Sequence, residues 1–171
     1  MFPNQWWYKF DVVETRCYLN MLEFINMSIE VRDNKLSYYK NWGVDHPGQS
    51  LIYSDKKHFI KEYCVLNYKV PRRTGATTAA LKIAIDNFKD SLFIYPNQSQ
   101  SLPTQIKLKN FDTKKVIPFM TESTVNNEGI SGAKYNDFII LDNASLFKDI
   151  KKVLKYLCEK CEDNIIILCI G

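Results

Sequence analysis

The chain has 171 residues, of which 46% are hydrophobic and 25% are charged, and its formal net charge is +4. This length and composition predict one globular domain with a sizeable core, and they exclude extended disorder and a disulfide-dense scaffold. The mild positive charge permits contact with nucleic acid but does not by itself indicate it.

Five cysteines, an odd number, favour free thiols in a reducing compartment. No apolar run approaches the ~18 residues that a membrane span requires, and the aromatic and polar N-terminus does not resemble a signal peptide. We therefore expect a soluble, cytoplasmic protein that has no membrane partner.

The N-terminal third is predicted to be helical. From about Phe10 to Glu30, apolar residues recur at spacings of three and four, which is typical of an amphipathic helix. A loop is predicted from about Asn41 to Ser50, where glycine and proline interrupt the chain, and a short helix from Ser54 to Tyr63. We expect residues 1–50 to form a helical extension on an α/β core of residues 51–171.

The rest of the chain is predicted to contain both strands and helices. Five apolar or β-branched runs predict strands: Cys64–Val70, Ser91–Tyr95, Lys115–Met120, Phe138–Leu141 and Ile165–Ile170. Pro118 places the third strand at a sheet edge, because proline cannot donate to a ladder.

Helices are predicted from Thr77 or Thr78 to Phe88 and from Leu146 to Cys161, and a polar surface loop from Thr121 to Asp137. This order requires crossover connections. The predicted fold is therefore α/β, with three layers and a mostly parallel sheet covered by helices on both faces.

Two segments place polar residues where ligands bind in such sheets, at the carboxyl ends of the strands. The segment from Val70 to Thr78 lies between a predicted strand and a helix, so its amides and the helix dipole would attract a phosphate. The Thr77 hydroxyl and the carboxylate of Asp142, which follows another strand, are suitable ligands for Mg²⁺. A strand-to-helix turn with a capping threonine, and an aspartate that caps a helix, are the simpler interpretations.

The phosphate-loop pattern G-x-x-x-x-G-K-[ST] is matched only in part. Gly75 fits the second glycine and Thr77 the hydroxyl, whereas Val70 replaces the first glycine and Ala76 replaces the lysine. The run from Pro71 to Thr78 nevertheless resembles the phosphate loops of viral large terminase ATPases and related helicase-like motors. Those P-loop NTPases often lack the first glycine and carry an arginine just upstream.

Later segments follow in the same order as in those motors. Residues 93–100 resemble the strand and polar turn after the first helix, residues 136–144 the Walker B strand, and residues 164–171 the strand that leads into the coupling motif. The resemblance covers roughly residues 49–171. It stops where the motor domain would continue, so we do not expect a complete packaging motor.

The resemblance implies that the chain binds ATP with Mg²⁺. The implied phosphate-binding residues are Arg72, Arg73, Thr74, Gly75, Ala76, Thr77 and Thr78, and the implied metal ligands are Thr77 and Asp142. Gln49 lies at about the distance where the motors place an adenine-reading glutamine, although a glutamine in an ordinary loop is the commoner explanation.

Two departures from the family argue against fast hydrolysis. Asn143 replaces the glutamate that activates the attacking water, and an amide cannot accept a proton as a general base. Ala76 replaces the phosphate-contacting lysine, so Arg72 or Arg73 would have to supply the positive charge. We expect a nucleotide-binding, ATPase-like protein whose hydrolysis is weak or absent.

Two alternatives belong to other classes. A P-loop fold that has lost its chemistry could serve as an interaction module, such as a viral protein that engages a host or viral partner in host takeover. Nucleic-acid binding, for example to DNA, could use the lysines of the last helix, Lys148, Lys151, Lys152 and Lys155, which a solvated face explains equally well. If the protein is viral, the host cytoplasm or the virion is its expected location. The C-x-x-C match at Cys158 and Cys161 has no second pair or nearby histidine, so buried thiols are expected there.

Overall fold

A parallel five-stranded sheet forms the centre of the molecule in the computed structural model, which describes residues 12–45, 56–71 and 74–171. The strand order is β1-β5-β4-β2-β3, and every neighbouring pair is parallel. The strands are β1 (Val65–Tyr68), β2 (Ser91–Tyr95), β3 (Phe119–Thr121), β4 (Phe138–Leu141) and β5 (Ile166–Ile170). The predicted parallel α/β sheet is confirmed.

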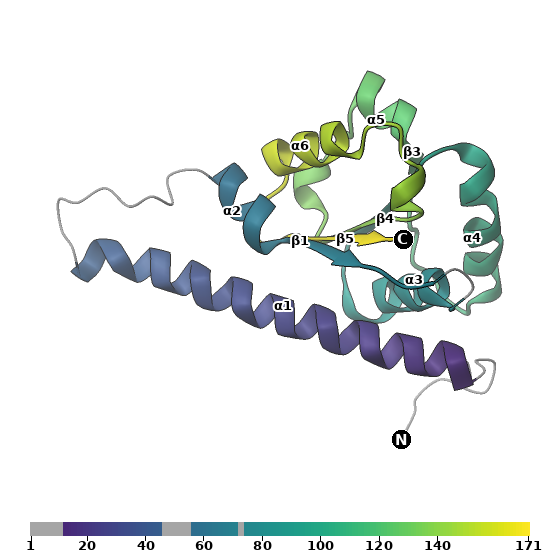
Figure 1. The fold of residues 1–171 in the computed structure, drawn as a ribbon, viewed down its shortest axis with the longest axis horizontal. Helices are drawn as coiled ribbons and strands as arrows, with labels where there is room; N and C mark the ends of the chain where they lie inside the picture. The colour runs from purple at the N-terminus through teal and green to yellow at the C-terminus, as the bar shows by residue number, and fades with distance from the viewer. Residues whose placement is uncertain (1–11, 46–55, 72–73) are drawn as a thin grey trace.

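Helices cover both faces of this sheet, which makes three layers (Figure 1). The helices are α1 (Val12–Asp45), α2 (Lys56–Tyr63), α3 (Ala76–Asn87), α4 (Gln98–Asn110), α5 (Glu122–Glu128) and α6 (Ile150–Lys160). Residues of α1, α3 and α4 pack on one face, and residues of α2, α5 and α6 pack on the other. Two short 3-10 turns, η2 (Ala133–Tyr135) and η3 (Ala144–Leu146), flank β4.

The central strands explain why the sheet is buried on both sides. Every residue of β4 and β5 is buried, and successive side chains enter opposite layers. Ile140 and Leu168 belong to the α3 side, while Ile139 and Ile167 belong to the α6 side. Apolar runs without alternation therefore mark strands that helices cover on both faces.

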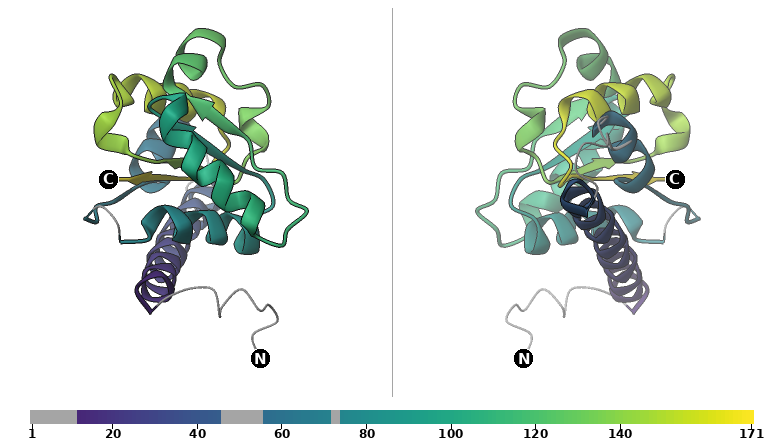
Figure 2. Two further views of the ribbon diagram at one scale, coloured as in Figure 1. Left: turned by 90° about the vertical axis from the view of Figure 1, so that its right-hand side faces the viewer. Right: turned by 90° about the vertical axis from the view of Figure 1, so that its left-hand side faces the viewer.

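Helix α1 crosses beneath the sheet beside α3, as the end-on view in Figure 2 also shows. Met21 and Ile25 are fully buried in the core that α1 shares with α3. The buried Arg32 donates hydrogen bonds to the carbonyls of Asn164 (2.7 Å) and Ile165 (3.1 Å), which fixes α1 to the start of β5. The side chains of Met21, Ile25 and Arg32 thus join α1 to the core at several points along the helix.

The loop predicted from Asn41 to Ser50 is wrong in its first half, because α1 continues to Asp45; residues 46–50 lie outside the described part. A single glycine in a helix costs only about 1 kcal/mol relative to alanine, so Gly43 does not stop a long packed helix. The short helix predicted from Ser54 is confirmed from Lys56 to Tyr63.

Helix α4 was not predicted, and α5 replaces part of the surface loop predicted from Thr121 to Asp137. Asn97 caps α4 by accepting a hydrogen bond from the Gln100 amide, and Thr121 caps α5 in the same way through the Thr124 amide. Pro103 and the polar first turn of α4 hide its periodicity. Helix α5 has only seven residues, and packing against α6 stabilises it.

Smaller differences concern the ends of elements. The third strand begins at Phe119, after Pro118, and it is an edge strand as predicted. Leu146 belongs to η3 and is 43% exposed, so it is not part of the apolar face of α6. Among the described helices, none combines the length and the apolar character that a bilayer span requires.

Candidate functional site

A cleft of about 460 Å³ opens at the carboxyl ends of the strands. Five chain segments meet there: the residues that follow β1, β4 and β5, the start of α3 and the N-terminal half of α4. The lining residues are Val70, Pro71, Thr74, Ala76, Thr77, Ser99, Gln100, Pro103, Asp142, Asn143, Leu146, Ile170 and Gly171. The cleft therefore lies where the sequence predicts ligand binding.

Helix α3 begins differently from the other helices that follow a strand. Gly75 is its N-cap residue and has a left-handed backbone (φ 82°), and no side chain of the described residues caps the helix there. Helices α4, α5 and α6 each have a capping side chain, from Asn97, Thr121 and Asp149. The first-turn amides of α3 thus lie at the cleft wall formed by Ala76 and Thr77 without an acceptor from a capping residue.

Thr77 and Asp142 meet at the base of the cleft. The Thr77 hydroxyl donates a hydrogen bond of 2.8 Å to Asp142 Oδ2, although the two residues are 65 positions apart. The backbone N–H of Asp142 donates to the Ile94 carbonyl (3.1 Å), which holds the carboxylate at the end of β4 beside β2. The fold thus brings together the two segments that the sequence singled out.

Burial is the main influence on the Asp142 carboxylate, which is only 3% exposed. Desolvation raises the pKa of Asp142, while hydrogen bonds from the Thr77 hydroxyl and the Asn143 amide (2.9 Å) lower it, as do the neighbouring Tyr95 and the charge of Lys107. Desolvation outweighs these contacts. A carboxylate buried in this way gains stability from any cation that binds beside it.

Tyr95 is the last residue of β2, and it interacts with Asp142. Its side chain is fully buried, and its hydroxyl donates a hydrogen bond of 2.6 Å to Thr104 of α4. Burial, with the charge of Asp142 as a second cause, raises the pKa of the Tyr95 phenol. The phenol therefore stays protonated, and it ties α4 to the strand beside Asp142.

The predicted site residues divide into three groups. Thr74, Ala76, Thr77 and Asp142 line the cleft. Gly75 lies at the helix start, and the buried Thr78 turns its hydroxyl to Lys107 Nζ, which donates to it at 2.8 Å. The predicted residues Arg72, Arg73 and Gln49 lie outside the described part of the chain.

Sequence reasoning missed the contribution of α4. Ser99, Gln100 and Pro103 line the cleft, and Lys107 reaches the first turn of α3 from the same helix. Asn97 followed three residues later by Gln100 is a capping pattern and could have identified this helix. The packing of α4 against α3, in contrast, cannot be predicted from a local sequence pattern.

The donor atoms at Thr77 and Asp142 fit a hard divalent cation. Both are oxygens. The Thr77 hydroxyl donates a hydrogen bond to Asp142, and its oxygen keeps lone pairs that can bind a cation. Among the described residues, no cluster of three or more histidine, cysteine or acidic side chains could hold a metal by itself. A cation here would need further ligands from a bound molecule or from water.

Cys158 and Cys161 belong to no cluster of metal-ligating side chains within the described residues. Cys158 and Cys161 are buried free thiols near the end of α6, as expected, and burial raises the pKa of Cys161 to about 12.

Comparison of the chain with protein-family models and with curated protein sequences found no match.

Proposed function

We propose that the cleft binds a nucleoside triphosphate together with Mg²⁺. The observation that carries this proposal is the 2.8 Å hydrogen bond between Thr77 at the start of α3 and Asp142 at the end of β4. A helix N-terminus attracts phosphate through its free amides and its dipole, and the absence of a capping side chain at Gly75 leaves room for such an anion. The P-loop resemblance of the sequence points to the same ligand.

In this proposal Thr77 and Asp142 hold the cation, and the phosphates and water complete its coordination shell. Mg²⁺ prefers oxygen ligands and commonly uses one or two protein groups plus phosphates. When bound, it would neutralise charge on the phosphates. It would also offset the desolvation of the Asp142 carboxylate, whose pKa burial raises.

Hydrolysis is expected to be slow or absent. Asp142 is the only acidic residue among the described residues that line the cleft. Its carboxylate already accepts hydrogen bonds from the Thr77 hydroxyl and the Asn143 amide. Asn143, which follows it, can orient a water molecule but cannot take its proton. The site therefore favours nucleotide binding over turnover.

Isothermal titration with ATP and Mg²⁺ tests the proposal. Binding at sub-millimolar concentration is expected. It should weaken at least tenfold in Thr77→Ala, which removes a ligand of the cation, and without Mg²⁺, which removes the cation itself. Phosphate release should stay near the uncatalysed rate. The exposed Ser131 offers a matched control, and Ser131→Ala should bind like the unmodified protein.

Two results would contradict the proposal. One is a flat titration at millimolar ATP with Mg²⁺. The other is ATP binding that Thr77→Ala leaves unchanged, because the nucleotide would then occupy a different place. A steady turnover that depends on Asp142 would instead overturn the expectation of slow hydrolysis.

A second candidate function is that of an interaction module that does not use nucleotide. Ala76 and Asn143, both in the cleft wall, are the observations that favour it, because they remove the groups on which P-loop chemistry depends. It predicts a stoichiometric protein partner that binds equally well with or without ATP. Partner binding that requires ATP and fails in Thr77→Ala would decide for the first candidate.

A further inference from the structure

The described cleft wall lacks a positive charge. None of the described residues that line it is a lysine or an arginine, and Ala76 occupies the position where the phosphate-loop pattern has lysine. Polyphosphates bind poorly without a cationic group, because several negative charges must leave water together. The sequence assigns this role to Arg72 and Arg73 of the loop, which lie outside the described part of the chain. A cation from a described element that approaches the start of α3 would add to their charge.

Helix α4 carries such a cation. Ser99 and Pro103 line the cleft, and Lys107 follows them at the same four-residue spacing, so the three residues share one face of the helix. Helical side chains lean toward the N-terminus of their helix, which here is the end that borders the cleft. The stem of Lys107 is thereby directed toward the site.

The ammonium group of Lys107 lies at the first turn of α3. Lys107 Nζ donates a hydrogen bond of 2.8 Å to the Thr78 hydroxyl, and Thr78 directly follows the cleft residue Thr77. The ammonium therefore lies one residue from Thr77, whose hydroxyl donates to Asp142 at 2.8 Å.

The charge of Lys107 is still available. Within the described part of the chain, no carboxylate forms an ion pair with Lys107, and an ammonium has three donors, of which Thr78 takes one. The other lysines near α3 are occupied: Lys82 pairs with Asp86 at 3.1 Å, and Lys115 binds carbonyls at the opposite end of the helix.

We propose that Lys107 binds the terminal phosphates of the nucleotide and replaces the lysine that the loop lacks at Ala76. This inference rests on the proposed function and assigns a binding residue from outside the phosphate loop. In it, Lys107 keeps or exchanges its bond to Thr78 and directs its remaining donors at the phosphate oxygens. The contribution of α4 then makes the cleft specific for ligands with several phosphates.

The test compares ATP and AMP binding, both with Mg²⁺, in Lys107→Met and Lys109→Met. Both variants remove one positive charge from an exposed position of α4. We expect Lys107→Met to weaken ATP binding at least tenfold and AMP binding less than threefold, because AMP lacks the terminal phosphates. Lys109→Met should change neither ligand by more than twofold. Lys107→Arg should retain most of the ATP affinity.

Two further variants separate phosphate contact from packing. Thr78→Val removes the acceptor of Lys107 but not its charge, so ATP binding should fall by less than threefold if Lys107 contacts phosphate. Ala76→Lys placed in the Lys107→Met protein should restore ATP affinity, since it returns an ammonium to the loop. Urea unfolding of each variant reports whether the fold is intact.

The outcomes are distinguishable. Equal ATP binding by Lys107→Met and Lys109→Met, with the unmodified protein still binding ATP, would overturn the role of Lys107 and leave the proposed function standing. An equal loss for ATP and AMP would show that Lys107 only packs α4 against α3, and would also overturn it. Failure of the unmodified protein to bind ATP would remove both proposals.

Discussion

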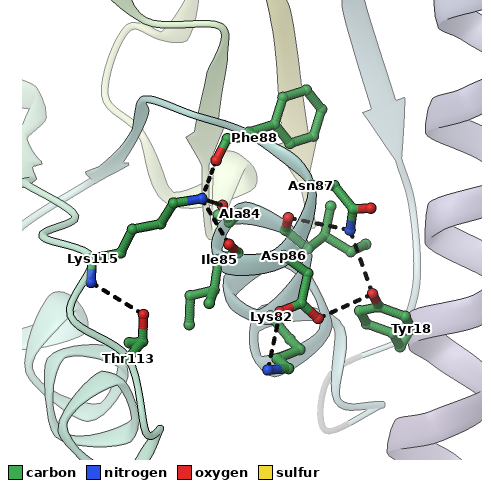
Figure 3. Close-up of polar contacts among 10 residues, drawn as sticks. Tyr18, Lys82, Ala84, Ile85, Asp86, Asn87, Phe88, Thr113 and Lys115 are labelled. Atoms are coloured by element: carbon green, nitrogen blue, oxygen red, sulfur yellow. Dashed lines mark hydrogen bonds and ion pairs between the residues drawn. The ribbon is translucent and has the colours of Figure 1, made fainter. Parts of the chain in front are cut away.

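The two ends of α3 are built in opposite ways. At the C-terminal end, Lys115 Nζ donates to the carbonyls of Ala84 (3.5 Å), Ile85 (2.7 Å) and Phe88, which the helix itself leaves without partners (Figure 3). At the N-terminal end no side chain of the described residues caps the helix, and its first turn forms a cleft wall. Positive charge stabilises a helix C-terminus, so Lys115 satisfies the C-terminal end of α3 without any ligand. The N-terminal end, in contrast, leaves space for an anion.

The C-terminal end is also held from its other side. The Tyr18 hydroxyl of α1 donates to Asp86 (3.3 Å) and accepts from Asn87 Nδ2 (3.4 Å), and Lys82 pairs with the same carboxylate (Figure 3). Burial lowers the pKa of Lys82 and raises the pKa of Tyr18. The comparison teaches that the contacts which stabilise a helix can lie at one of its ends while a candidate binding site lies at the other.

The largest effect is expected from removing the aromatic contact at the closed end. Phe88, the C-cap residue, stacks on the buried Phe138 at 4.2 Å between ring centroids. Phe138→Ala should lower the free energy of unfolding by about 3–5 kcal/mol, because it leaves a large cavity. Urea denaturation measures this. Tyr135→Ala, at a 71% exposed aromatic, should cost below about 1 kcal/mol; equal losses would contradict the prediction.

The next effect concerns the carbonyl cap. Lys115→Met keeps most of the side-chain stem but removes the charge, so the free energy of unfolding should fall by about 2 kcal/mol, as for hydrogen bonds to a charged group. Its neighbour Lys114 is exposed, and Lys114→Met should change stability by less than about 0.5 kcal/mol. ATP binding should be unchanged in both variants. A binding loss in Lys115→Met would break the separation between the two ends.

A smaller loss is expected at the open end from Gly75→Ala. The backbone there has φ 82°, which costs a non-glycine residue about 1–2 kcal/mol. An added Cβ would lie 3.1 Å from Cγ of the flexible Glu14 side chain, which can move. Asparagine tolerates this backbone better, so thermal unfolding should rank Gly75→Asn between alanine and glycine. Equal losses for both variants would point to crowding instead of strain.

The smallest effect should come from Tyr18→Phe. The change removes the hydroxyl that bonds to Asp86 and Asn87 but keeps the ring, so a loss of about 0.5–1.5 kcal/mol is expected. Hydrogen exchange of the amides near Asn87 should increase more than exchange near Thr77, because the contact holds the C-terminal end. Uniform acceleration along α3 would show that the two ends are not energetically separate.

Much of the fold could be predicted because the strands carry strong local signals. Ser91–Tyr95 and Phe138–Leu141 were predicted with the bounds that the structure has. The misses, α4 and α5, are helices with polar or short sequences whose stability comes from caps and packing. Pro103 inside α4 obscured it further. Local sequence preference predicts a helix or strand correctly only where contacts with neighbouring elements do not outweigh that preference.

The candidate site was predictable only in its parts. Thr77 and Asp142 each stand out next to a strand end, so both could be named from the sequence. Ser99, Gln100 and Lys107 could not, because their role depends on how α4 lies against α3. Spacing along the chain gives no information about that contact.

The sequence by itself determined the order of the five strands along the chain, the burial of the central strands and the glycine that turns the chain before α3. These properties follow from backbone preference and hydrophobic pattern, which act between near neighbours. Only the tertiary structure decided that Thr77 meets Asp142, that Lys107 approaches the start of α3 and that Lys115 closes its other end. Each of these contacts joins residues about 30 or more positions apart, and the sheet order brings them together.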